Sequence, residues 1–132
     1  MGKRAGCVSP VHAGSGAKTA VRDGLVRHVL TDDPTNRGLW QNSAAAAGTY
    51  QNGGYWGTPA GWYIAAMAKA DRGAAAEMAR EFVRFLRQHM RPDGMTEAWE
   101  WSNPDTGRTA NPLYVATVAL PYLSLKEVGM LP

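Results

Sequence analysis

The chain has 132 residues, of which 45% are hydrophobic and 19% are charged, and its formal net charge is +3. This size and balance fit one globular domain and exclude a disordered tail. The positive charge is small and comes without a dense run of Lys and Arg, so we expect no nucleic-acid partner. The single cysteine excludes an intrachain disulfide and a zinc site built on cysteines, and no metal site is expected.

The N-terminal part gives few structural signals. Its basic start at residues 1–4 is not followed by the apolar run of a signal peptide. No apolar stretch of the chain is long enough to span a bilayer, so we expect no membrane association and assign the cytoplasm by default. Residues 1–49 are rich in Gly, Ala, Ser and Asp and are expected to form an irregular, loop-rich segment, with a short strand or an extended loop at 25–30.

Three helices are expected in residues 50–132. The first follows Thr58 and Pro59, which read as an N-cap and a proline at the first helical position, and it is apolar all round. The second, at about 74–90, has one apolar stripe and charged residues on its other faces. The third, at about 113–127, is again apolar almost all round, and a short β-hairpin or extended loop is expected before it, near 96–110.

This alternation of buried, amphipathic and buried helices predicts a mainly α fold. Inner and outer helices alternate in this way in an α/α toroid, whereas a four-helix bundle would need an amphipathic stripe on every helix. Three helices cannot close such a ring. We therefore expect residues 50–132 to form the helical hairpins of an incomplete α/α barrel, with exposed apolar helix faces through which copies of the chain self-associate.

The densest functional signal is the sequence Tyr-Gln-Asn-Gly-Gly-Tyr-Trp at 50–56. Aromatic rings stack on the apolar C–H faces of sugars, and amide side chains bond sugar hydroxyls, so we expect a carbohydrate substrate as the partner. The candidate sugar-binding residues are Gln51, Asn52, Tyr55, Trp56 and Trp62. The alternative is that the aromatic side chains only fill the core.

A second signal is the sequence Glu-Ala-Trp-Glu-Trp at 97–101. If this segment is extended, Glu97 and Trp99 share one face and Glu100 takes the other. Glycoside hydrolysis uses two carboxyl groups that flank the bond, so Glu97 and Glu100 are candidate catalytic residues and Trp99 is a candidate for substrate binding. The alternative is a surface loop with solvated glutamates and packed tryptophans.

The first motif before an apolar helix, and Gly-Met-Thr-Glu-Ala-Trp-Glu-Trp before another, resemble the C-terminal third of six-hairpin, (α/α)6-barrel glycosidases. The resemblance covers about residues 50–128, with a weaker match around 24–28. It implies hydrolysis of a glycosidic bond in a central funnel without a cofactor. It places Gln51, Asn52, Tyr55 and Trp56 at the sugar, with Glu97 or Glu100 nearby. It also implies that the isolated chain lacks the second catalytic carboxylate, which in this family usually lies on an earlier hairpin.

Two further features remain open. His28 belongs to the site if its loop folds over the funnel, and is otherwise a structural histidine. The arginines at 80, 84, 87 and 91 are interleaved with glutamates, which is typical of a solvated helix face. The functions that compete with a glycoside hydrolase are a non-catalytic sugar-binding module, a helical interaction module and an inactive truncated relic.

Overall fold

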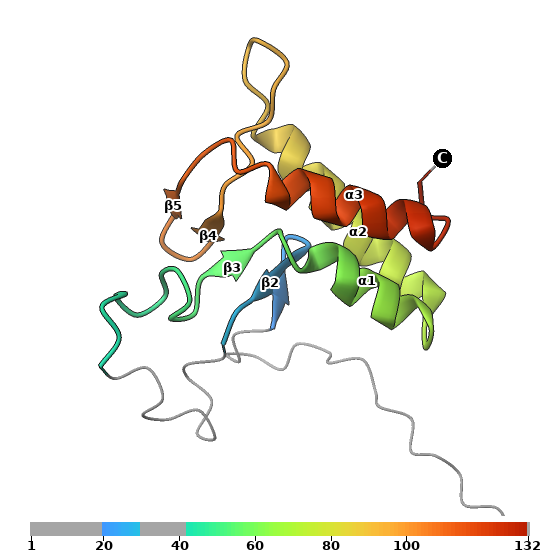
Figure 1. The fold of residues 1–132 in the computed structure, drawn as a ribbon, viewed down its shortest axis with the longest axis horizontal. Helices are drawn as coiled ribbons and strands as arrows, with labels where there is room; N and C mark the ends of the chain where they lie inside the picture. Colours follow the sequence, from blue (N-terminus) through green and yellow to red (C-terminus); the bar gives the residue numbers. More distant parts are fainter. Residues whose placement is uncertain (1–19, 30–41, 132) are drawn as a thin grey trace, which may run out of the picture.

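The computed structural model of the chain describes residues 20–29 and 42–131, which form a five-stranded antiparallel sheet and three helices (Figure 1). The strands are β1 (Val21–Arg22), β2 (Leu25–Arg27), β3 (Tyr55–Trp56), β4 (Trp101–Asn103) and β5 (Arg108–Ala110). The helices are α1 (Ala60–Ala68), α2 (Arg72–Gln88) and α3 (Ala116–Glu127). The strands lie side by side in chain order, with α1 and α2 inserted between β3 and β4.

The expected α/α toroid is wrong, because the extended segments pair with one another instead of serving as loops between helices. Val26 of β2 lies opposite Trp56 of β3, and Tyr55 of β3 lies opposite Ser102 of β4. The hairpin expected near 96–110 is present as β4 and β5, but as part of this sheet. The described residues therefore form a mixed α/β fold.

The two apolar helices are not the inner helices of a ring either. The buried side of α1 is narrow and consists of Ala60, Gly61 and Ile64. Trp62 and Tyr63 on α1 are exposed, as are Tyr122 and Leu123 on α3. An apolar helix thus keeps a solvent-exposed side here, since much of any protein surface is apolar. Self-association through these side chains stays a prediction.

Helix α2 has the expected amphipathic stripe. It begins after Asp71, whose side chain accepts a hydrogen bond of 2.9 Å from the backbone N–H of Ala74 and so caps the helix. Its buried residues recur at steps of three and four: Ala75, Met78, Phe82 and Phe85. This spacing places them on one side of the helix, toward the core.

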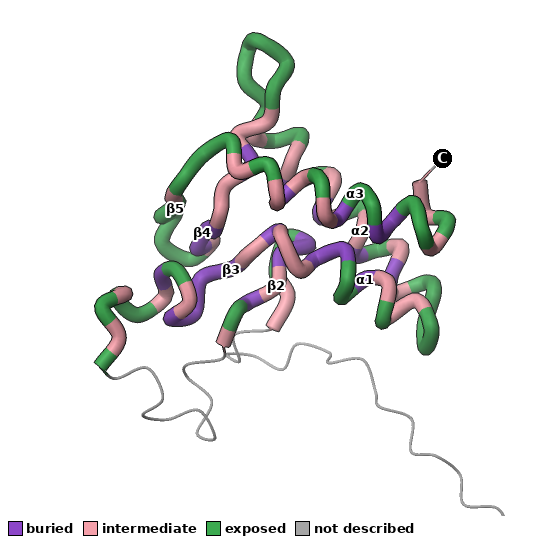
Figure 2. Tube along the Cα trace, viewed as in Figure 1, coloured by how far each residue is buried: buried purple, intermediate pink, exposed green. Residues whose placement is uncertain are grey.

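The core lies where the sheet meets the helices. Leu25 and Tyr55 contribute from the sheet, and Ile64, Phe82 and Leu125 contribute from the three helices. Buried residues gather where β3 runs into α1 (Figure 2). Helix α1 packs against both α2 and α3, so it is the element that joins the helical layer.

The contact between α1 and α3 depends on the absence of a side chain at Gly61. A Cβ there would lie 2.5 Å from Pro121 Cα and 2.8 Å from Ser124 Cβ. We expect Gly61→Ala to destabilise the fold by about 1–2 kcal/mol, because about 1–3 kcal/mol of overpacking outweighs a gain of up to about 1 kcal/mol in helix propensity.

The matched control for this change is Gly73→Ala in the first turn of α2. There the nearest atom to an added Cβ is Asp71 Oδ1 at 3.3 Å, so the propensity gain should prevail and the variant should be neutral or slightly more stable. Urea denaturation of both variants measures the difference. A shift of the same sign and size in both would contradict the close contact at Gly61.

Candidate functional site

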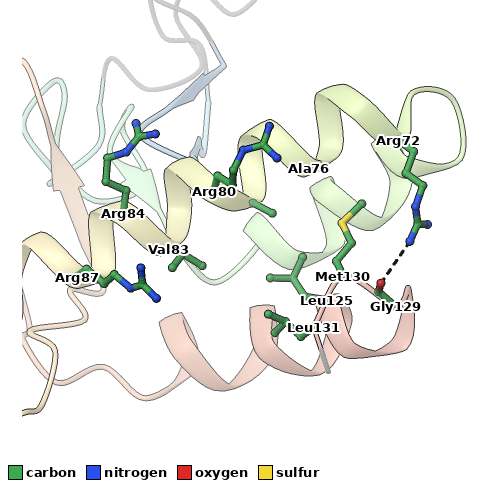
Figure 3. A pocket seen from close by; sticks show the side chains of 11 residues that line it. Arg72, Ala76, Arg80, Val83, Arg84, Arg87, Leu125, Gly129, Met130 and Leu131 are labelled. Atoms are coloured by element: carbon green, nitrogen blue, oxygen red, sulfur yellow. Dashed lines mark hydrogen bonds between the residues drawn. The ribbon is translucent and has the colours of Figure 1, made fainter.

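Two surfaces of the described residues are candidates for binding, and the first is a groove between α2 and the C-terminal end of α3. Its volume is about 600 Å³. Figure 3 shows Arg80 and Arg84 along α2 on one side of the apolar side chains, with Arg72 near Gly129 at the far end. Arg80, Arg84 and Arg87 are exposed, as expected for a solvated side of the helix. Ala76 and Ala79 line the groove beside these arginines, and nothing in the sequence marked them as binding residues.

The second surface is built on the turn that precedes β3. The backbone N–H of Gly48 donates to the carbonyl of Asn52 at 2.7 Å, and that of Gly54 donates to the carbonyl of Tyr50 at 2.9 Å. A Cβ at Gly54 would lie 2.6 Å from the same Tyr50 oxygen, so only glycine fits there. The Asn-Gly-Gly sequence therefore closes a tight turn that holds Tyr50 close to the start of β3.

Three aromatic rings meet at this turn. The Trp56 ring centroid lies 5.2 Å from that of Tyr50 and 6.2 Å from that of His28, with interplanar angles of 53° and 48°. The Trp56 indole N–H donates to the Tyr50 carbonyl at 3.2 Å, which fixes the ring orientation. Tyr50 and His28 are exposed and Trp56 is half-buried. We call Tyr50, Trp56 and His28 the aromatic cluster.

The two amide residues of the motif lie differently. Asn52 is buried, and its side-chain N–H donates to the carbonyl of Ala45 at 2.8 Å, so this amide holds the turn together. Gln51 is half-buried, and its side chain makes no hydrogen bond with a described residue. Of the two amide side chains, that of Gln51 is therefore the one that can form hydrogen bonds with a ligand.

Tyr55 lies under the cluster instead of on it. It is 2% exposed and belongs to the hydrophobic core. The guanidinium carbon of Arg27 lies 5.8 Å from the centroid of its ring, and Arg27 Nε donates to the carbonyl of Gly53 at 3.1 Å. Through the hydrogen bond from Arg27 to Gly53, this buried pair holds the turn against the core. The stacking role given to Tyr55 stays a prediction that its burial does not favour.

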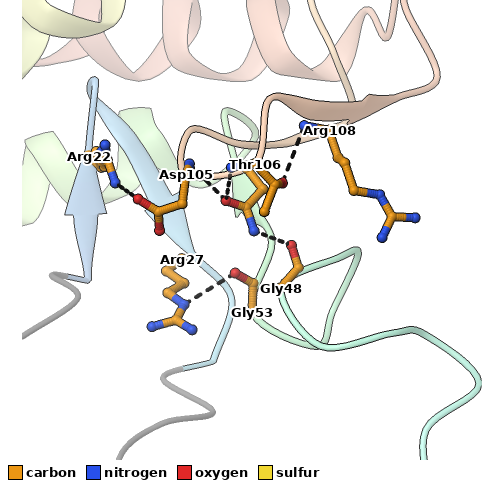
Figure 4. A network of polar contacts seen from close by, with 8 residues as sticks. Arg22, Arg27, Gly48, Gly53, Asp105, Thr106 and Arg108 are labelled. Atoms are coloured by element: carbon orange, nitrogen blue, oxygen red, sulfur yellow. Dashed lines mark hydrogen bonds and ion pairs between the residues drawn. The ribbon is translucent and has the colours of Figure 1, made fainter.

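A polar network ties the turn to the β4–β5 hairpin (Figure 4). Asn103 Nδ2 donates to the carbonyl of Gly48 at 2.7 Å, while Asn103 Oδ1 accepts from the backbone N–H of Asp105 at 2.9 Å. Asp105 also forms an ion pair with Arg22 on β1. Asn103 on β4 therefore anchors the turn directly, and Arg22 on β1 holds the β4–β5 hairpin in turn.

The two candidate catalytic glutamates differ in their partners. Glu100 Oε2 accepts a hydrogen bond of 2.6 Å from Asn111 Nδ2, so this carboxylate is held at the hairpin. Glu97 is anchored through its backbone N–H, which donates to the carbonyl of His89 at 2.8 Å. The carboxylate of Glu97 makes no hydrogen bond or ion pair with any described residue.

The two remaining candidate tryptophans lie apart from the cluster. Trp62 is 56% exposed on α1, and within residues 20–29 and 42–131 no ring contact joins it to Trp56. Trp99 is half-buried against the core, and its indole N–H is buried without a partner among the described residues. Its carbonyl accepts from the hydroxyl of Thr117 at 2.8 Å, which fixes the segment against α3. Of the predicted site residues, His28 and Trp56 are joined by a ring contact and Gln51 lies in the turn beside them, whereas Trp62 has no such contact among the described residues.

Two other properties bear on function. In the part of the chain that the structure describes, no cluster of three or more His, Cys, Asp or Glu residues has the arrangement of a metal site. Of the helices in the described ranges, none has the length and apolar character that a membrane crossing needs.

Comparisons of the chain with protein-family models, with curated proteins and with solved structures found no match. The resemblance to six-hairpin glycosidases and the roles it implies therefore stay predictions.

Proposed function

We propose that the chain is a carbohydrate-binding protein whose contact surface is the aromatic cluster. The observation that carries this proposal is the fixed orientation of Trp56, whose ring is flanked by Tyr50 and His28 and whose indole N–H is already hydrogen-bonded. A rigid aromatic surface binds a sugar ring at a low entropic cost, because little has to be ordered on binding.

Gln51 supports the same proposal. It follows Tyr50 directly in the turn, and its amide has no hydrogen-bond partner among the residues described. An amide offers both a donor and an acceptor, which matches the mixed character of sugar hydroxyls. An apolar surface with a few polar groups at its margin is the usual composition of a small-molecule site.

Trp56→Ala tests the proposal. The probes are cellohexaose, xylohexaose, maltohexaose and chitohexaose, titrated into the protein by isothermal titration calorimetry. We expect one of them to bind and the variant to bind it about two- to tenfold more weakly, since an aromatic contact contributes about 0.5–1.5 kcal/mol.

The matched control is Tyr122→Ala, which removes an exposed aromatic side chain from α3, outside the cluster. It should leave the affinity unchanged, and circular dichroism should show that both variants are folded. Equal losses in the two variants, or no binding of any probe by the unaltered chain, would count against the aromatic cluster as a carbohydrate site.

Hydrolysis of the bound sugar is a second candidate function. The observation that favours it is the half-buried Glu97, whose carboxylate forms no hydrogen bond or ion pair with a described residue and so is available to bond a substrate oxygen. Under this proposal Glu97 is the acid or base, and Glu100, bonded to Asn111, is the alternative.

A further inference from the structure

We propose that the groove between α2 and α3 is a docking site for an acidic amphipathic helix of a partner protein. This is independent of the aromatic cluster, since the two surfaces share no residue.

The first support is the charge of the groove. Its lining includes four arginines and no acidic residue: Arg72, Arg80, Arg84 and Arg87. Two of them are already engaged, since Arg80 pairs with Glu77 and Arg72 donates to the carbonyls of Val128 and Gly129 at 3.3 Å. Arg84 and Arg87 form no ion pair with a described residue, so their charge is available to a partner.

The state of Glu77 is consistent with this excess of positive charge. The hydrogen bond from Arg80 lowers the pKa of Glu77, and the charges of Arg80 and Arg84 act in the same direction. Glu77 stays ionised and offsets only part of the positive charge along this side of α2. The net field of the groove is therefore expected to attract an anionic partner.

The second support is the apolar surface between the arginines and the end of the chain. Val83 on α2 faces Leu125 on α3, and Met130 and Leu131 close the groove beyond α3 (Figure 3). Together with the small side chains of Ala76 and Ala79, they give an apolar floor beside a row of cations. An amphipathic helix presents the complementary pattern, an apolar stripe flanked by charge.

The spacing of the arginines matches that of carboxylates on a partner helix. Arg80, Arg84 and Arg87 are separated by four and three residues, so they lie one helical turn apart along α2. Carboxylates one helical turn apart on a partner helix can pair with both Arg84 and Arg87, whereas a ligand with a single carboxylate can pair with only one of them. A second copy of the chain, with the same arginines and a net charge of +3, would bring like charges together.

The probe is a synthetic peptide, acetylated and amidated, whose Leu residues recur at positions i, i+4 and i+7 and whose Glu residues flank them with the same period. A peptide of the same composition in scrambled order is its control. Binding is measured by fluorescence anisotropy of labelled peptide with the full chain. We expect the ordered peptide to bind at least about tenfold more tightly than the scrambled one.

The protein variants test the charges. Arg84→Glu combined with Arg87→Glu should weaken binding of the ordered peptide by at least about tenfold. The control Arg108→Glu changes an exposed arginine on β5, outside the groove, and should alter binding by less than about twofold. Circular dichroism should show that every variant is folded.

Three results would overturn the proposal. One is the absence of binding at peptide concentrations up to about 1 mM. Another is equal affinity for the ordered and scrambled peptides, which would mean that the arginines attract any anion. The third is an equal loss of affinity for the ordered peptide in Arg108→Glu and in the groove variant, which would mean that only the net charge of the protein determines binding.

Discussion

Replacing Gly24 by Ala is expected to destabilise the fold by about 2–5 kcal/mol. Gly24 has φ +72° in the turn between β1 and β2, and a Cβ there would lie 2.3 Å from Phe82 N and 2.4 Å from Phe82 Cα. The left-handed conformation costs about 1–2 kcal/mol for a residue with a side chain. Overpacking against the backbone of α2, which cannot rotate away, adds about 1–3 kcal/mol.

The control for this prediction is Gly107→Ala in the turn between β4 and β5. Gly107 has φ +68°, but no atom lies within 4 Å of an added Cβ. Gly107→Ala should therefore lower the free energy of unfolding only by the cost of the left-handed conformation, about 1–2 kcal/mol. The measurement is the free energy of unfolding from urea denaturation. If Gly24→Ala costs no more than Gly107→Ala, the turn does not sit directly against α2.

Glu97→Gln is the second variant with a large expected effect. If the chain hydrolyses the sugar that it binds, loss of the proton carrier should lower the rate by about 10²–10⁴-fold. The affinity for the sugar should change little, because the aromatic cluster is unaltered. Release of reducing ends from the bound hexasaccharide measures the rate, and calorimetry measures the affinity.

Glu127→Gln, at the end of α3, is the control with the same chemical change on an exposed residue. Its rate should equal that of the unaltered chain. An unchanged rate in Glu97→Gln would transfer the role to Glu100, which the corresponding Gln variant tests. A chain that binds sugar but releases no reducing ends in any form is a binding module.

The helices could be predicted from the sequence because their signals are local. Asp71 caps α2, and the step of three and four residues from Met78 through Phe85 marks its buried side. The predicted fold class was wrong because the sheet depends on pairing between segments that are distant in the sequence, such as Tyr55 with Ser102. Strands of two or three residues are too short to show a period of two.

One part of the sheet did have a local signal. Asp23 and Gly24 both have positive φ and connect the paired residues Arg22 and Leu25, as in a two-residue hairpin turn. Asp-Gly between β-prone residues is a strong hairpin signal. It marks the first two strands, although it says nothing of their pairing with β3.

The candidate site was predictable only in part, for the same reason. The turn at 50–56 is local, so Tyr50 and Trp56 could be placed together from the motif. His28 joins them only because β2 pairs with β3, which the sequence does not reveal. The burial of Tyr55 likewise follows from the core behind the sheet.

The edge strands of the sheet limit how the chain can pair with other chains. The outer strands β1 and β5 have two and three residues, and Arg22 and Arg108 lie on them, with Asp105 paired to Arg22. Short, charged edge strands resist the addition of a further strand, which is the usual route to sheet-driven aggregation. Within the described residues, the addition of a strand from another chain is therefore disfavoured at both edges of the sheet.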